Sequence, residues 1–201
     1  MALIHSATIS PTKLELLAAW LPGRSWFTGD PNVRRLGAYR FDDPAGEVGL
    51  EALIVRSDGP VLHTPLTYRD APLAGADDFL VGTTEHSVLG KRWVYDGCAD
   101  PVWVAAAASV VVGDGGQAEE IFATDGQQQR REPSATVAGS GSAGRSPVID
   151  AVTCHDDGGT TVVRGGGVEL VVVRVVGTEI SVTDTLTGAW SGGSGVLAGI
   201  R

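Results

Sequence analysis

The feature that most constrains the fold is a row of three strand-like runs separated by strong turn signals. The runs span residues 34–42, 48–57 and 61–69, and the turns between them read Asp-Pro-Ala-Gly and Asp-Gly-Pro. Gly, Pro and Asp in such positions end one strand and allow the next to begin. The spacing therefore predicts three consecutive antiparallel strands. The middle run is apolar at successive positions, which predicts a strand covered on both faces.

A second set of strand-like runs lies towards the C-terminus. These runs span residues 148–154, 160–164, 168–176, 179–183 and 195–200, with Gly-rich turns between several of them. The preceding stretch, residues 113–147, is polar, rich in small residues and without period, which predicts a flexible loop or linker. The chain is accordingly divided into 1–112, 113–147 and 148–201, the last being an antiparallel β region.

Two helices are predicted in the first part. Ser10-Pro11 supplies an N-cap and a first helical residue, apolar residues then recur at helical spacing, and Pro22-Gly23 ends the pattern. Asp100-Pro101 repeats this start before the run 102–112, whose valines would also suit a strand. The fold class is therefore α+β, mostly antiparallel: a curved sheet flanked by one or two helices, followed by a smaller antiparallel sheet. One large twisted sheet crossing both halves is the alternative.

The charge balance limits the partners. With 24 acidic and 15 basic residues the formal net charge is −9, which repels nucleic acid and anionic membrane surfaces. No apolar run reaches the ~18 residues that a membrane span needs. The N-terminal residues lack the pattern of a signal peptide. We expect a cytoplasmic protein that contacts neither nucleic acid nor membrane.

The sequence contains no motif for a metal or cofactor. Cys98 and Cys154 are too far apart for a paired-cysteine zinc site and are expected to be free, buried thiols. Residues 154–157 read Cys-His-Asp-Asp, but neighbouring residues of an extended segment point to opposite faces and seldom share an ion. The Gly-rich stretches match no phosphate-binding pattern. We predict no metal and no cofactor.

Two short signatures, PLTYR at 65–69 and WVYDG at 93–97, stand about one hairpin apart and are expected to lie on neighbouring strands. Their residues, with one more acid, form a candidate interaction surface: Pro65, Leu66, Tyr68, Arg69, Trp93, Tyr95, Asp96 and Asp100. The alternative is structural. Tyr68 and Trp93 would then fill the core, Arg69 would pair with Asp96 or Asp100, and Asp100 would cap the second helix.

PLTYR followed by LGKRWVYDGCADPVWV (89–104) resembles the N-terminal cap domain of actinobacterial maltokinases, which are kinases of the aminoglycoside-phosphotransferase type that phosphorylate maltose. The resemblance covers residues 10–112 and extends more weakly to the C-terminus as a remainder of the kinase N-lobe sheet. It implies that Val172 stands near the place of the ATP-contacting lysine. It also implies that the chain lacks the C-lobe, with its catalytic aspartate and magnesium ligands.

The resemblance implies a non-catalytic, cap-like protein that binds another protein, such as a kinase-fold or α-glucan enzyme, or associates with itself, in the metabolism of α-glucan or maltose phosphate. Two alternatives stay open. The chain could be half of a split sugar kinase completed by a separate C-lobe. It could also be a carbohydrate-binding module that stacks sugars on Trp26 or Trp190, the two tryptophans expected to be exposed.

Overall fold

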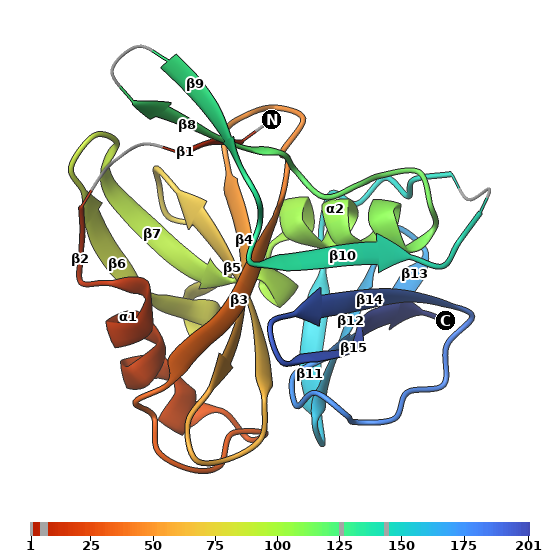
Figure 1. Cartoon of the computed structure of the whole chain (residues 1–201). Helices are drawn as coiled ribbons and strands as arrows, with labels where there is room; N and C mark the ends of the chain where they lie inside the picture. The colour runs from red at the N-terminus through yellow and green to blue at the C-terminus, as the bar shows by residue number, and fades with distance from the viewer. Residues whose placement is uncertain (1, 5–7, 125–126, 143–144) are drawn as a thin grey trace.

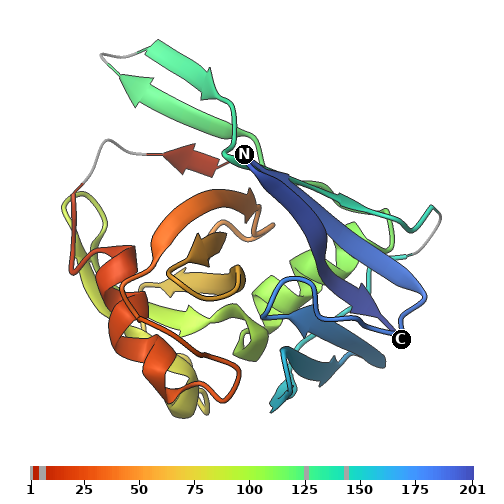
Figure 2. The same ribbon diagram turned by 60° about the horizontal axis from the view of Figure 1, so that its bottom comes forward.

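The protein consists of two six-stranded antiparallel sheets with a helix between them (Figure 1). The computed structural model describes residues 2–4, 8–124, 127–142 and 145–201. One helix lies between the sheets, a second covers the outer face of the first sheet, and a small three-stranded sheet projects from the body (Figure 2). The predicted fold class, α+β and mostly antiparallel, is confirmed.

The first sheet has the strand order β2-β6-β7-β5-β4-β3. The three runs predicted from the turn signals are its consecutive antiparallel strands β3, β4 and β5, and the two signatures lie side by side on β5 and β7, where Arg69 is opposite Trp93. The bounds are β2 Ile9–Ser10, β3 Arg34–Phe41, β4 Gly49–Arg56, β5 Leu62–Arg69, β6 Leu80–His86 and β7 Gly90–Asp96, with a 3-10 turn η2, Asp77–Phe79, before β6.

The first helix, α1 (Lys13–Trp20), begins two residues later than predicted. Its N-cap is Thr12, whose side chain accepts a hydrogen bond from the Glu15 backbone, while the Glu15 carboxylate accepts one from the Thr12 backbone at 2.7 Å. This capping box satisfies two free amides. Ser10, the predicted cap, lies in β2 instead. The helix ends in the 3-10 turn η1, Leu21–Gly23, at the predicted Pro-Gly.

The second helix, α2 (Pro101–Val111), forms where the ambiguous Val- and Ala-rich run was predicted to be helical. Asp100 is its N-cap and accepts a hydrogen bond from the Val102 backbone, and Pro101 is its first residue. A short 3-10 turn, η3 (Gly97–Ala99), joins it to β7. The helix stops before Gly113, whose φ of 83° is one that L-residues rarely adopt.

The second sheet has the strand order β10-β14-β15-β13-β12-β11 and departs from the prediction in four places. Residues 184–190, for which no strand was predicted, form β14, and β11 begins at residue 153 rather than at residue 148. Residues 135–139, expected to be a loop, form β10 and pair with β14 along its whole length; residues 179–183, expected to be a strand, are irregular. The bounds are β10 Ala135–Gly139, β11 Thr153–Asp157, β12 Thr160–Gly165, β13 Val168–Val173, β14 Asp184–Trp190 and β15 Gly193–Ile200.

The two sheets are separate, so the alternative of one continuous sheet is not realised. Within the described residues, an isolated bridge between Leu62 and Val175 joins their backbones. Two backbone hydrogen bonds of 2.9 Å flank it, from His63 N to Arg174 O and from Val176 N to Val61 O. The start of β5 is thereby tied to the chain that leaves β13.

The projecting sheet also comes partly from the predicted linker. In it β1 (Ala2–Ile4) runs parallel to β8 (Glu120–Thr124), and β8 pairs antiparallel with β9 (Gln127–Arg131). The range 113–147 therefore contains three strands, β8, β9 and β10. We attribute β8 and β10 to pairing with the distant strands β1 and β14, which local composition does not reveal, whereas β9 pairs with β8, its neighbour in sequence.

The apolar core has two parts. One surrounds α2 and is built from both sheets; it includes Tyr39, Phe41, Trp103, Leu170 and Leu197. The other lies between α1 and the first sheet. Strand β4 contributes to both, with Leu50, Ala52 and Ile54 facing α2 and Leu53 and Val55 facing α1. The prediction that this strand is covered on both faces is confirmed.

Candidate functional site

Arg69, at the end of the PLTYR signature, is bound to the N-cap of α2. Its Nε donates to Asp100 Oδ2 and its Nη2 to Asp100 Oδ1, both at 2.7 Å, which is the bidentate geometry of a strong ion pair. Asp100 is fully buried and also accepts a hydrogen bond from the Val102 backbone at 3.0 Å. Of the two predicted partners, Asp96 and Asp100, Arg69 therefore pairs with Asp100. This ion pair connects the end of β5 to the start of α2.

Asp96, in the WVYDG signature, pairs with a residue of the second half. It accepts a hydrogen bond from Nη2 of Arg174, which follows β13, and both side chains are buried. Arg174 Nε donates to the Thr161 hydroxyl at 2.8 Å, and that hydroxyl donates to Asp156 at 2.7 Å. The guanidinium also lies 5.3 Å from the ring centroid of Trp26. We call these five residues the junction cluster, because they connect the two sheets.

His63 lies beside the junction cluster and is part of the same contact between the sheets. Its Nδ1 is 3.1 Å from the carbonyl oxygen of Val173, and its Nε2 is 2.8 Å from the hydroxyl of Tyr39. Burial, and next the positive charge of Arg174, lower the pKa of His63 to about 3. The imidazole is therefore neutral at pH 7, and donating from Nδ1 while accepting from Tyr39 satisfies both ring nitrogens.

A second buried carboxylate, Glu51 of β4, lies on the α1 side of the first sheet. It accepts hydrogen bonds from Arg40 Nη2 at 2.8 Å, from the Tyr68 hydroxyl at 2.9 Å and from Lys13 Nζ. Burial alone would raise the pKa of Glu51, but the charges of Arg40 and Lys13 lower it to about 2. We call these four residues the Glu51 cluster. It fixes the first residue of α1 to the sheet.

The other signature residues serve mainly to pack. Pro65, Leu66 and Tyr95 are buried, and the Tyr95 hydroxyl accepts a hydrogen bond from the Leu73 backbone at 3.0 Å. Trp93 is half-buried, with Lys91 Nζ 4.8 Å from the centroid of its ring. The eight residues predicted to form one surface are thus divided between both faces of the first sheet and its contact with α2.

Sequence reasoning missed Glu51 and Arg174. Each was visible as a charged residue next to an apolar run, in LEALIV (50–55) and ELVVVR (169–174). A charge in such a position is rarely buried without a partner. The pattern could have predicted buried ion pairs, although it could not have named their partners.

The two tryptophans predicted to be exposed are not freely exposed. Trp26 is only 5% exposed, since its ring packs edge-on against Trp20 at 5.8 Å and under Arg174. The expectation for Trp26 is therefore wrong. Trp190 is half-buried and packs against the core around α2. Trp26 therefore lacks the open flat face that stacking on a sugar ring requires.

The thiols of Cys98 and Cys154 are both free, as predicted; Cys98 is buried and Cys154 half-buried. Burial raises the pKa of Cys98 well above its usual value and that of Cys154 to about 12, so neither is a ready nucleophile. Among the described residues, no three His, Cys, Asp or Glu side chains are placed to hold a metal ion. No helix in the described ranges is long and apolar enough to cross a membrane.

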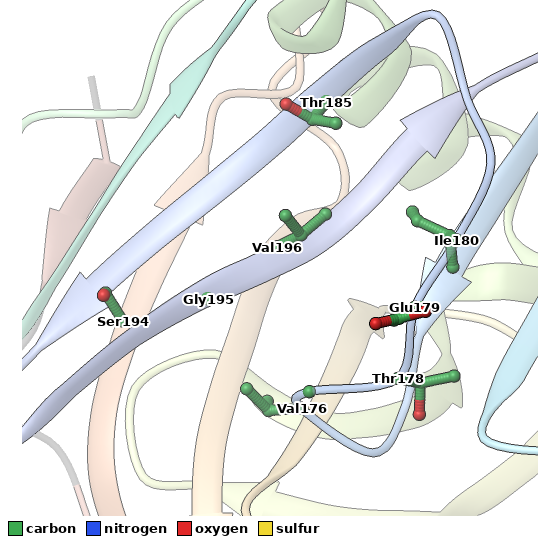
Figure 3. A pocket seen from close by; sticks show the side chains of 9 residues that line it. Val176, Thr178, Glu179, Ile180, Thr185, Ser194, Gly195 and Val196 are labelled. Carbon is green, nitrogen blue, oxygen red and sulfur yellow. The ribbon is translucent and has the colours of Figure 1, made fainter.

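A hollow lies in the second half, between the segment 176–180 and strands β14 and β15 (Figure 3). Its volume is about 450 Å³, and it opens to solvent. It is lined by Val176, Gly177, Thr178, Glu179, Ile180, Thr185, Ser194, Gly195 and Val196. None of these residues belongs to the predicted surface. The lining is mainly small and apolar, with hydroxyl groups and a single carboxylate.

Most of the first sheet matches a known protein family. Residues 20–100 match the family described as the maltokinase N-terminal cap domain. The matched span runs from the last residue of α1 to the N-cap of α2, and so contains β3 to β7 with both signatures. The predicted resemblance to that cap domain is confirmed, and the chain carries a cap-like region. No curated protein matches the chain.

Proposed function

We propose that this chain is a non-catalytic, cap-like module that acts by binding another protein. Its resemblance to the maltokinase cap domain supports a kinase-fold or α-glucan enzyme as the partner, with self-association as the second choice. The buried, apolar Val172 at the place where such a kinase would carry its ATP-contacting lysine supports a role without phosphate transfer.

The observation that carries this proposal is the tip of the β6–β7 hairpin. Val88 is 57% exposed and Leu89 47% exposed, side by side in the turn. Both lie within the span that matches the cap domain. Apolar side chains that remain in water on an otherwise well-packed sheet are suited to burial against a partner.

The tip is also preformed. Nδ1 of His86 accepts hydrogen bonds from the backbone amides of Val88 at 3.2 Å and of Leu89 at 3.1 Å. A turn that is already held in one conformation loses less conformational entropy when it binds. The two apolar side chains are thus presented by a rigid hairpin.

The experiment compares the unaltered protein with the double variant Val88→Ser, Leu89→Ser. Light scattering after size exclusion measures self-association, and affinity capture followed by mass spectrometry identifies partners. We expect the double variant to lose the captured enzyme, or the dimer, while its urea midpoint stays unchanged. Val148→Ser is the matched control, because Val148 is 77% exposed but lies in the second half.

A strict monomer that captures no protein would contradict the proposal. So would heat released on titration with Mg-ATP, which would point to half of a split kinase, or retardation by glycogen in affinity electrophoresis, which would point to a carbohydrate-binding module.

A further inference from the structure

Three of the four outer edges of the two six-stranded sheets are short or covered. β2 has only two residues. β3 is covered where the Ala38 amide donates to Ser134 Oγ at 2.9 Å. β10 is covered by the side chain of Gln117, which donates to Ala135 O at 3.0 Å and accepts from Val137 N at 2.9 Å. Such features keep a strand edge from pairing with another chain.

The fourth edge, β11, is open. A turn of two residues joins β11 to β12, so the flanking residues Asp157 and Thr160 are a hydrogen-bonded pair and bonded positions alternate along β11 from there. Cys154 and Asp156 therefore direct their amide and carbonyl groups away from β12. In the part of the chain that the structure describes, these four groups have no hydrogen-bond partner. The edge thus offers two donors and two acceptors.

The side chains leave this edge free. Cys154 packs against the core around α2. The Asp156 carboxylate accepts hydrogen bonds from the hydroxyls of Thr161 at 2.7 Å and Ser25 at 3.2 Å. Both side chains are therefore engaged on the inner face of the sheet, and their backbone lies at its rim. Four of the five residues of β11 are exposed, so solvent borders most of the strand.

A second hollow, of about 260 Å³, adjoins the start of β11. Its lining includes the side chains of Ala76, Phe79, Ala99, Val152 and Cys154. When an extended peptide adds to a sheet edge, main-chain hydrogen bonds supply affinity and a neighbouring pocket that accepts a side chain supplies specificity. A free edge beside a hollow is the arrangement that this mode of binding requires.

The charge around the edge and the hollow is negative. Asp77 and Asp78 lie in η2, which borders the hollow, and Asp157 lies at the end of β11; all three are exposed. Within the described ranges none of them forms an ion pair. Arg164 of β12 is already paired with Glu169 at 2.6 Å. In a chain of net charge −9 this edge repels a second copy and attracts a basic segment.

We propose that β11 binds an extended, basic segment of a partner protein, which adds a seventh strand to the second sheet. The segment bonds the backbone of Cys154 and Asp156 and places one apolar side chain in the hollow. This inference rests on the proposed function, protein binding, and adds a second contact that specifies the chemistry of the partner. The contact lies outside the cap-like region.

The test begins with selection from a phage library of random peptides of about nine residues against the full chain. The probe is the synthetic form of the most enriched peptide. We expect enrichment of Lys or Arg together with β-branched residues. Hydrogen exchange followed by NMR then locates the probe. The amides of Cys154 and Asp156 should become protected, whereas those of His155 and Asp157, which already bond β12, should change little.

Two variants test the edge and the hollow separately. Cys154→Pro removes an outward amide and should weaken binding of the probe about tenfold or more. Cys154→Ser is the matched control, because it replaces the same thiol but keeps the amide, and its affinity should stay within about twofold. Ala99→Leu narrows the hollow without altering β11 and should also weaken the probe about tenfold. If Cys154→Pro lowers the urea midpoint, Ala99→Leu decides the test.

No enrichment, enrichment of acidic peptides, protection of amides outside β11 alone, or unaltered affinity in both Cys154→Pro and Ala99→Leu would each overturn the inference. If these two variants still capture the partner that Val88→Ser, Leu89→Ser loses, the strand-addition site is refuted while the proposed function stands. If the unaltered chain captures no protein, the proposed function fails, and protection of Cys154 and Asp156 by the probe still decides the strand-addition site.

Discussion

The junction cluster and the Glu51 cluster are built from the same chemistry in different surroundings. Each holds a buried carboxylate against a cation. Arg174 of the junction cluster is fully buried, whereas Lys13 and Arg40 of the Glu51 cluster are 25% and 20% exposed. The first joins the two sheets, while the second joins α1 to one sheet. We therefore expect loss of the junction cluster to affect both sheets, and loss of the Glu51 cluster to affect only α1 and the sheet that it covers.

The largest effect is expected from Asp96→Ala. It leaves the guanidinium of Arg174 buried without its carboxylate, and arginine cannot lose its charge, so we expect a loss of about 3–5 kcal/mol in the free energy of unfolding. Urea denaturation measures this loss, and hydrogen exchange should show lower protection in both sheets.

Arg174→Met should cost less than Asp96→Ala, because the carboxylate left behind can bind a proton. Arg164→Met, which removes a pair to Glu169 from a 58% exposed arginine, is the control and should cost less than about 1 kcal/mol. A loss from Asp96→Ala that is no larger than this control would show that the junction cluster does not hold the sheets together.

Glu51→Gln comes next, with an expected loss of about 2 kcal/mol, because charged hydrogen bonds to Arg40 and Lys13 are weakened while solvent still reaches both cations. Faster hydrogen exchange should be confined to α1 and the facing strands. Equal loss of protection in β13 and β15 would contradict the local character of this cluster.

Acid should affect His63, which lies beside the junction cluster, at a higher pH than the Glu51 cluster. The unfolded chain protonates His63 near pH 6.5, whereas in the fold its pKa is about 3, so the unfolded state binds more protons between these values and stability falls as the pH is lowered. We expect a loss of about 1.5 kcal/mol between pH 6.5 and 5. Glu51, with a folded pKa of about 2, loses its contribution only as the pH falls from 4.5 to 2.

Urea denaturation from pH 8 to 4.5, on the unaltered chain and on His63→Gln, measures the first of these effects. The difference between the two chains should change with pH across this range. A constant difference would show that His63 takes up a proton in the folded protein as readily as in the unfolded one.

The smallest effects are expected at the edges of the two clusters. Tyr68→Phe removes a hydroxyl that donates to Glu51 and should cost about 1 kcal/mol. Ser25→Ala removes an exposed hydrogen bond of 3.2 Å to Asp156 and should cost less than about 0.5 kcal/mol. Thermal unfolding measures both losses of stability. A larger loss from Ser25→Ala than from Tyr68→Phe would contradict the expectation that the more buried hydrogen bond contributes more.

The first sheet was predictable because its signals are local. Turn residues separate β3, β4 and β5, and Asp100-Pro101 marks the start of α2 whatever lies around it. By contrast, β10 and β14 read ATVAG and DTLTGAW, sequences with small residues and glycine that give weak strand signals. They become strands because they pair with each other and pack on α2. The run 179–183 has strand-like residues but follows a segment held towards β5.

The same distinction holds for the ion pairs: the pair within the signature region was predictable, and the pair between the two sheets was not. Arg69 and Asp100 both lie in the signature region, and their pairing follows from adjacent strands and a helix cap. The pairing of Asp96 with Arg174 spans 78 residues of sequence and depends on how the second sheet packs against the first. Spacing within the sequence contains no information on that packing.

The position of α2 matters for any shortened form of this protein. The span that matches the cap domain ends at Asp100, one residue before the helix whose Trp103, Val104 and Ala107 fill the core between the sheets. A fragment cut at this limit would expose one whole apolar face of the first sheet and leave Asp96 without Arg174. We therefore expect that the cap-like region, although recognisable in sequence as a unit, does not fold stably without the residues that follow it. Part of its interior is formed by residues that the family match does not include.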